Sequence, residues 1–147
     1  MTISNIKRFD EVTGLVLGAL YESFPVPRPL FAGSFQSDID SRDDVVDSGT
    51  PHDVEAFFFA CVEWLAEAGY LRFADIQQAL GYHNCVLTAK GLEALKAFPK
   101  SLSTGPSLGD KLVDATKSGT KSMLGSLAGE VLSVGSRLVT THLGLPG

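Results

Sequence analysis

Hydrophobic residues recur every three or four positions in several stretches of the chain, which is the spacing of one face of an α-helix. The first stretch runs from Phe9 to Phe24 and ends at the alternating prolines of residues 25–29. Because proline fixes φ and has no amide proton, residues 25–29 are expected to form an extended connector. Gly14 and Gly18 lie within the predicted helix, where they permit close packing of a neighbouring element.

A second helix is predicted from Asp53 to Ala68 and is expected to stop at Gly69. The residues expected to face the core are Val54, Phe57, Phe58, Cys61, Trp64, Leu65 and Ala68. A separate stripe at intervals of four residues is expected to face outward, and it consists of Glu55, Phe59, Glu63 and Glu67. This stripe places an aromatic ring among three carboxylates, so we consider it a candidate partner-binding surface.

Two β-prone runs follow the second helix and predict a hairpin. The runs are residues 70–73 and 85–87, with residues 74–84 expected as an irregular tip that includes one helical turn around Ile76, Ala79 and Leu80. Thr88 is placed to cap a helix that extends to Phe98. The residues of this helix that are expected to face the core are Leu92, Leu95 and Phe98.

The composition changes at residue 100, so the chain is expected to divide into a domain at residues 1–99, a linker at 100–109 and an amphipathic helical tail at 110–147. Each glycine in this tail costs a helix roughly 1 kcal/mol relative to alanine, so the tail is expected to need a packing partner. Self-association and docking on the body are both open. The residues expected to mediate oligomerisation are Met123, Gly125, Leu127, Gly129, Val131, Val134 and Leu138.

The pattern Trp64-Leu65-x-x-x-Gly69-Tyr70-Leu71, followed by Leu87-Thr88-x-x-Gly91-Leu92-x-x-Leu95, resembles winged helix-turn-helix proteins. The resemblance implies a mainly α fold with a small β-hairpin, an α+β winged-helix-like body before the tail. In that family the helix matching residues 53–68 enters the major groove of DNA and presents Arg, Lys, Asn or Gln. None of these four residue types occurs in residues 53–68 of this chain.

The charge distribution also disfavours nucleic acid as the partner. The 147 residues carry a net charge of −5, and residues 1–98 hold seven Lys and Arg against fourteen Asp and Glu. Binding to phosphates requires a positive surface, because the released counterions supply most of the affinity. We therefore expect a non-enzymatic protein-binding module, a bacterial or phage regulatory, adaptor or toxin-neutralising protein that presents an acidic surface to a basic partner.

Two alternatives remain at the level of the sequence. One is a DNA-binding transcriptional regulator that is dimerised through its tail and contacts DNA through Arg72, Lys90 and Lys96. The other is a membrane-surface protein that uses the amphipathic tail helix. The first predicts salt-sensitive binding to duplex DNA, and the second predicts that anionic vesicles raise the helicity of the tail.

Motifs for catalysis, metals and cofactors are not found in the sequence. The two cysteines, Cys61 and Cys85, lie in apolar patterns and are expected to be buried and reduced, and the three histidines show no metal-ligand spacing. The expectation is therefore no enzymatic activity, no metal and no cofactor. Neither a signal peptide nor a transmembrane segment is expected, which makes the cytoplasm the expected location. The acidic residues 32–51 are expected to form a solvated surface.

Overall fold

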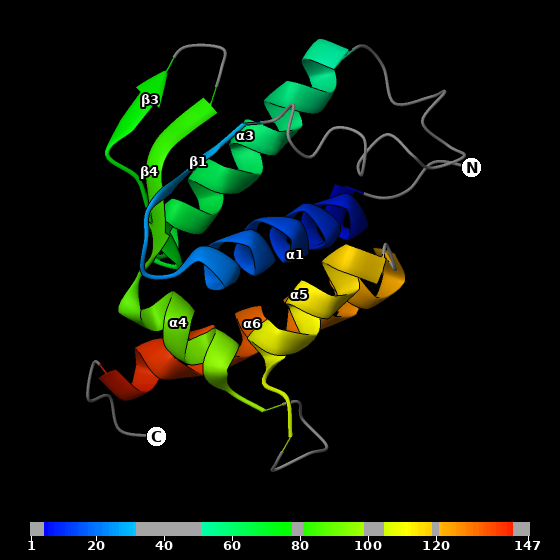
Figure 1. Ribbon diagram of the computed structural model, residues 1–147, viewed down its shortest axis with the longest axis vertical. Coiled ribbons are helices and arrows are strands. Elements are labelled where there is room, and N and C mark those ends of the chain that lie inside the picture. Colours follow the sequence, from blue (N-terminus) through cyan, green and yellow to red (C-terminus); the bar gives the residue numbers. More distant parts are fainter. Residues whose placement is uncertain (1–4, 32–50, 78–80, 99–104, 119–120, 143–147) are drawn as a thin grey trace.

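A small antiparallel sheet and several helices surround one central helix, α1 (Figure 1). The computed structural model describes residues 5–31, 51–77, 81–98, 105–118 and 121–142. In these ranges the helices are α1 Asn5–Ser23, α3 Pro51–Glu67, α4 Ala89–Lys96, α5 Leu108–Ser118 and α6 Lys121–His142. The strands there are β1 Arg28–Leu30, β2 Leu71–Arg72, β3 Asp75–Gln77 and β4 Gly81–Leu87. The mainly helical α+β class is thus confirmed, whereas the acidic segment 32–50 lies outside the described residues.

The sheet is larger than the predicted hairpin. β4 pairs antiparallel with β1 on one side and with β2 and β3 on the other. The proline-rich connector thus ends in a strand, and Pro29 is tolerated because β1 lies at a sheet edge. The helical turn expected around Ile76 is wrong, since Asp75–Gln77 is a strand that pairs with residues 81–83 of β4. Residues 78–80 lie outside the described part.

The helix α1 is buried on all sides along its middle. Residues 11–18 are all buried, including the polar side chains of Glu11 and Thr13. A helix that has no exposed face must be covered by other elements all round. In Figure 1, α3 and the sheet lie on one side of α1, and α5, α6 and α4 lie on the other.

The two C-terminal helices belong to the same hydrophobic core as α1. Their buried core residues are Leu108, Leu112, Ala115, Leu124, Leu127 and Val131. The expected close approach at Gly14 is confirmed, because a Cβ there would lie 3.0 Å from the carbonyl oxygen of Leu124 in α6. Of the two arrangements expected for the tail, docking on the body is therefore the one found within this chain.

The start of α5 is fixed by a reciprocal pair of hydrogen bonds. The amide of Asp110 donates to Ser107 Oγ at 3.2 Å, and the amide of Ser107 donates to Asp110 Oδ2 at 3.3 Å. These bonds use amides that an α-helix leaves without partners at its N-terminus. Because α5 begins at Leu108, the last two residues of the expected linker 100–109 are helical, whereas residues 100–104 lie outside the described part.

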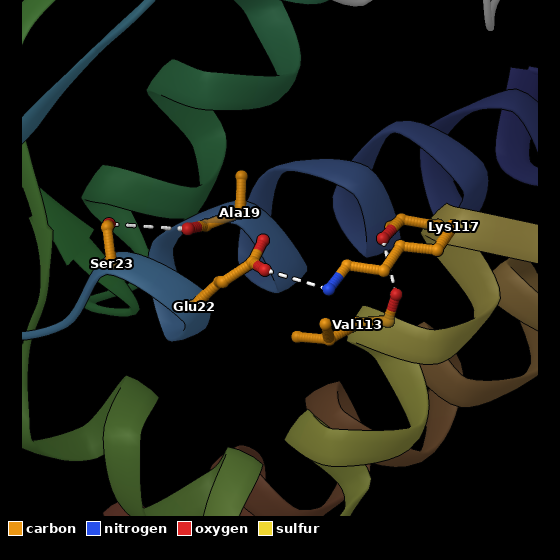
Figure 2. A network of polar contacts seen from close by, with 6 residues as sticks. Ala19, Glu22, Ser23, Val113 and Lys117 are labelled. Atoms are coloured by element: carbon orange, nitrogen blue, oxygen red, sulfur yellow. Dashed lines mark hydrogen bonds and ion pairs between the residues drawn. The ribbon is translucent and has the colours of Figure 1, made fainter.

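Contacts between α1 and α5 are mainly apolar, and an ion pair joins the two helices at the surface. Lys117 Nζ lies 3.1 Å from Glu22 Oε2, and the two side chains are 66% and 51% exposed. Figure 2 shows this ion pair between α1 and α5. Exposed ion pairs of this kind contribute only about 0–1 kcal/mol. Burial of residues such as Leu112 and Ala115 therefore supplies most of the stabilisation at this contact.

Tyr70 joins three elements at the end of α3. Gly69 has a φ of 90°, and the Tyr70 amide donates to the Leu65 carbonyl at 2.9 Å, which is a common way for a helix to end. The Tyr70 carbonyl accepts from the amide of Thr88 at 3.1 Å, and its hydroxyl donates to the carbonyl of Leu132 in α6 at 3.0 Å. Tyr70 thereby holds α3, the cap of α4 and the second half of α6 together.

Thr88 caps α4 as predicted, since its side chain accepts from the amide of Gly91 at 3.1 Å. The expected core position of Phe98 is wrong, because its side chain is 46% exposed. The helix α4 ends at Lys96, and the backbone at Ala97 is extended, so helical periodicity no longer sets the direction of Phe98.

The contact between Tyr70 and α6 generates a stability prediction. A Cβ at Gly135 would overlap the ring of Tyr70, which is buried and held by its hydrogen bond to α6. We expect Gly135→Ala to lower the free energy of unfolding by about 1–3 kcal/mol through overpacking. Gly129→Ala is the matched control, because no atom lies within 4 Å of its added Cβ. That control should raise stability by up to about 1 kcal/mol in urea unfolding. Equal stability of the two variants would contradict the described packing.

Candidate functional site

An apolar groove opens between the first turns of α1 and the middle of α3. Its volume is about 390 Å³, and its walls are formed by Asn5, Ile6, Phe9, Phe57, Ala60 and Trp64, with Cys61 at its floor. We call it the α1/α3 groove. Large hydrophobic side chains remain exposed there, since Ile6 is 72% and Trp64 is 49% exposed. Apolar side chains gathered in an open groove are typical of ligand and partner sites.

Aromatic contacts hold the walls of the α1/α3 groove in place. The rings of Phe9 and Trp64 meet edge to face with centroids 5.3 Å apart. The guanidinium of Arg8 lies 4.3 Å from the centroid of the Phe57 ring. Such contacts contribute roughly 0.5–1.5 kcal/mol each and fix the relative position of α1 and α3. The groove is therefore built by two helices that aromatic contacts hold together.

The predicted core position of Trp64 is wrong, although the helix and its periodicity were right. Trp64 lies on the side of α3 that faces the first turns of α1, where residues 5–7 are themselves exposed. Ile6 and Phe9 did not enter any predicted site, because α1 was identified only as an amphipathic packing helix. In the sequence, Ile6 and Phe9 extend the apolar pattern into the N-terminal turns of α1, and this extension is the feature that could have indicated them.

The floor of the groove is chemically inert. Burial raises the pKa of the Cys61 thiol to about 12, and the nearby Arg8 guanidinium lowers it by a smaller amount. Burial also raises the pKa of Cys85 to about 11, against the smaller effects of a hydrogen bond at Leu30 and of the Arg28 charge. Because only the thiolate is a good nucleophile, neither cysteine is suited to covalent chemistry. The expectation that both are buried is confirmed, and no disulfide joins them.

The acidic stripe of α3 does not form one outward surface. Phe59 is half-buried, with its ring centroid 5.6 Å from that of Tyr82 in β4. Glu63 accepts a hydrogen bond of 2.9 Å from the hydroxyl of Tyr82, which also points toward the backbone carbonyl of Phe59. The expected outward position of Phe59 is therefore wrong, because β4 packs on that side of α3. Glu55 is half-buried as well, whereas Glu63 and Glu67 remain exposed.

Burial and a neighbouring carboxylate act together on Tyr82. The pKa of its phenol is raised, first by burial and then by the hydrogen bond and the negative charge of Glu63. The phenol thus stays protonated and donates to Glu63 across the range in which proteins are usually studied. This bond joins α3 to the sheet beside the groove.

The three cations of the alternative DNA-binding surface have different environments. Lys90 Nζ donates to the carbonyl of Ala68 at 2.6 Å and lies 4.4 Å from the centroid of the Tyr70 ring. Lys90 therefore caps the C-terminal end of α3, and its ammonium does not extend freely into solvent. Arg72 on β2 and Lys96 in the last turn of α4 are exposed.

Most of the residues expected to mediate oligomerisation contact this same chain. Leu127 and Val131 are buried, while Val134 and Leu138 are partly buried and pack on the core. A Cβ at Gly125 would lie 3.6 Å from Asp10 of α1. These five residues face inward because α6 lies along α1 and α4. Met123, which is 52% exposed, and Gly129 point away from the core.

A second, more polar groove of about 300 Å³ lies between the end of α4 and α6. It is lined by Phe98, Ser126, Gly129, Glu130, Ser133, Val134 and Arg137. Arg137 donates to Ser133 Oγ at 3.2 Å, so part of its polar lining is already paired within α6. The α1/α3 groove, with its aromatic walls, is the stronger candidate for a binding site.

Comparison with known proteins adds no family to these observations, since the chain matches no protein family, no curated protein and no solved structure. In the ranges that the structure describes, no three His, Cys, Asp or Glu side chains are placed to share a metal ion. The described helices also include none that combines the length and the hydropathy needed to span a membrane.

Thiol labelling tests the environment described for the two cysteines. At about pH 8 we expect both thiols of the native chain to react with a disulfide reagent far more slowly than a free cysteine, because burial holds both thiols protonated and covered. As the control, the same chain unfolded in guanidinium should react rapidly with two equivalents of the reagent, one for each cysteine. Since both pKa values are raised, native labelling should accelerate only as the pH rises well above 9. Rapid native labelling of either thiol near pH 8 would contradict the described core.

Proposed function

We propose that this chain is a non-enzymatic protein-binding module and that a protein partner docks in the α1/α3 groove. The observation that carries the proposal is the exposure of Trp64, the single tryptophan of the chain, beside Ile6 in an apolar groove. Tryptophan is strongly enriched among the residues that dominate binding energy at protein interfaces. The proposed function is therefore still protein binding, but the residue at the centre of the proposed interface is Trp64 instead of Phe59.

The acidic surface remains part of the proposal. Glu63 and Glu67 are exposed on α3 beside and one turn beyond Trp64, and α3 carries no Lys or Arg. Exposed carboxylates beside an apolar centre steer a partner of opposite charge and select it. A regulatory, adaptor or toxin-neutralising role in a bacterial or phage setting is compatible with an acidic binder of this kind. This choice of role depends on analogy of fold and surface.

A winged-helix-like arrangement is the form that we propose for the body. Its support is the order of the elements, in which α3 leads into antiparallel strands and the Thr88-capped α4 follows directly. β1 adds a third paired strand from the segment after α1. The proposed use of that arrangement is protein binding, because α3 would bring carboxylates to DNA phosphates.

The other two functions have weaker support. DNA binding through Arg72, Lys90 and Lys96 would require Lys90, whose ammonium already donates a hydrogen bond to the Ala68 carbonyl at the end of α3. Membrane binding through α6 would require Leu127 and Val131 to leave the core that they share with α1. Either change would sacrifice contacts that stabilise the fold, whereas the α1/α3 groove is already open.

A comparative pull-down tests the proposed function. The bait is the full chain in nuclease-treated lysate, with Trp64→Ala as the test variant and Val26→Ala as a control, since Val26 is 66% exposed and lines neither of the two grooves. We expect a stoichiometric protein to be retained by wild type and by the control and reduced at least about tenfold by Trp64→Ala. Circular dichroism confirms that both variants are folded.

Two results would contradict the proposal. One is recovery of the same proteins by Trp64→Ala as by wild type, which would place the interface elsewhere. The other is specific duplex DNA in an untreated lysate, retained with a steep salt dependence and without a protein partner, which would favour the DNA-binding alternative.

A further inference from the structure

We propose that the occupant of the α1/α3 groove is an amphipathic helix of another protein, with apolar side chains seated in the groove and Lys or Arg side chains set against Glu63 and Glu67. This inference rests on the proposed function and names the chemistry of the partner. It follows from the shape of the groove, the charge of α3 and the exposed face of Trp64.

The shape of the site favours a helix. Two helices, α1 and α3, form the walls, and the floor is apolar at Cys61. A third helix laid in such a groove inserts side chains spaced three and four residues apart and keeps its backbone hydrogen bonds within itself. An extended peptide would need partners for its backbone amides, which apolar walls do not supply. The groove thus matches helix-in-groove recognition.

The charges near Trp64 favour a cationic occupant. Trp64 is half exposed, Glu63 is adjacent to it in sequence, and Glu67 follows one helical turn later. A Lys or Arg of the occupant at this place can contact an aromatic face and two carboxylates. At the opposite wall, the guanidinium of Arg8 is already placed over Phe57. The groove is therefore electrostatically asymmetric, and its Trp64 side is the one that attracts a cation.

The same charges argue against two other occupants. A second copy docked with its α3 against α3 would bring acidic residues together, since this helix contains Asp53, Glu55, Glu63 and Glu67 but no Lys or Arg. Like charges brought together at an interface suppress association. An anionic membrane surface would be repelled by the same carboxylates.

Synthetic peptides supply defined probes for this inference. The first is an 18-residue helix-forming peptide of leucine and lysine with its leucines on one face, and the second replaces every lysine with glutamate. A scrambled leucine–lysine peptide of identical composition controls for net charge. Because Trp64 is the single tryptophan of the chain and the peptides contain none, its fluorescence reports occupancy of the groove directly. We expect a saturable change in emission with the first peptide, and binding at least about tenfold weaker with the other two.

Charge reversal on α3 tests the role of the carboxylates. We expect Glu63→Lys combined with Glu67→Lys to weaken binding of the leucine–lysine peptide at least about tenfold and to strengthen binding of the leucine–glutamate peptide. Glu67→Lys alone leaves the hydrogen bond between Tyr82 and Glu63 intact and should shift both affinities in the same directions. The matched control combines Glu93→Lys with Asp114→Lys, which changes the net charge equally at exposed positions on α4 and α5. The control should bind within about twofold of wild type, because screening weakens charges that lie beyond the contact.

The apolar part of the contact has its own matched pair. Ile6→Ser should weaken binding of the leucine–lysine peptide about tenfold. Val26→Ser should leave that binding unchanged, since Val26 is 66% exposed but lies outside the groove lining. Both residues are largely exposed, so neither substitution should unfold the chain.

The outcomes separate this inference from the proposed function. Equal binding of all three peptides, no response of Trp64 to any of them, or equal effects of the two double charge reversals would each overturn the cationic-helix assignment. If Trp64→Ala still loses a protein partner in the pull-down, protein binding at the groove stands even though the chemistry of its occupant differs. If that variant loses nothing and the peptides also fail, both the function and the occupant are rejected.

Discussion

Residues 11–18 of α1 have no side facing solvent, so this helix must be covered on all sides at once by separate parts of the chain. One side is covered by α3 and the sheet, and the other by α5 and α6 (Figure 1). Close approach at Gly14 brings α6 within van der Waals distance of the α1 backbone. Because the apolar surface removed from water is shared among all these elements, residues beyond 105 contribute to the same core as residues before 99. A division into body and tail describes the sequence better than it describes the packing.

The layers on the two sides of α1 are joined by Tyr70. Its backbone ends α3 and meets the cap of α4, while its hydroxyl reaches the carbonyl of Leu132. Lys90 adds a hydrogen bond to the last turn of α3 and a contact with the Tyr70 ring. Each of these hydrogen bonds satisfies a backbone carbonyl that would otherwise need a water molecule. The junction thus contains several hydrogen bonds within an otherwise apolar region. This combination fixes the angle of α6 relative to α3 more closely than apolar packing alone.

Helical periodicity and caps were sufficient to locate α1, α3 and α4, because these signals act within one or two turns of the chain. The Thr88 cap and the stop at Gly69 are local and were found from sequence. The strand β1 was missed because its pairing with β4 depends on residues more than fifty positions away, and prolines hide its extended character. Trp64 and Phe59 were assigned to the wrong faces for a related reason. Periodicity shows which residues share a face but does not show which face a distant strand or helix will cover.

The α1/α3 groove lies where the coverage of α1 ends. Toward its N-terminus the helix emerges from the layers around it, and Asn5, Ile6 and Lys7 are exposed. The exposed parts of apolar side chains add little to the stability of the isolated chain, and when they gather in one place they promote association. Ile6 and Trp64 are gathered in this way, with Phe9 and Arg8 holding the walls in position. The carboxylates of Glu63 and Glu67 are exposed on α3 beside and one turn beyond Trp64, and the proposed preference for a cationic partner rests on them. The proposed function and the proposed occupant both rest on this arrangement, in which an apolar centre lies beside carboxylates of α3.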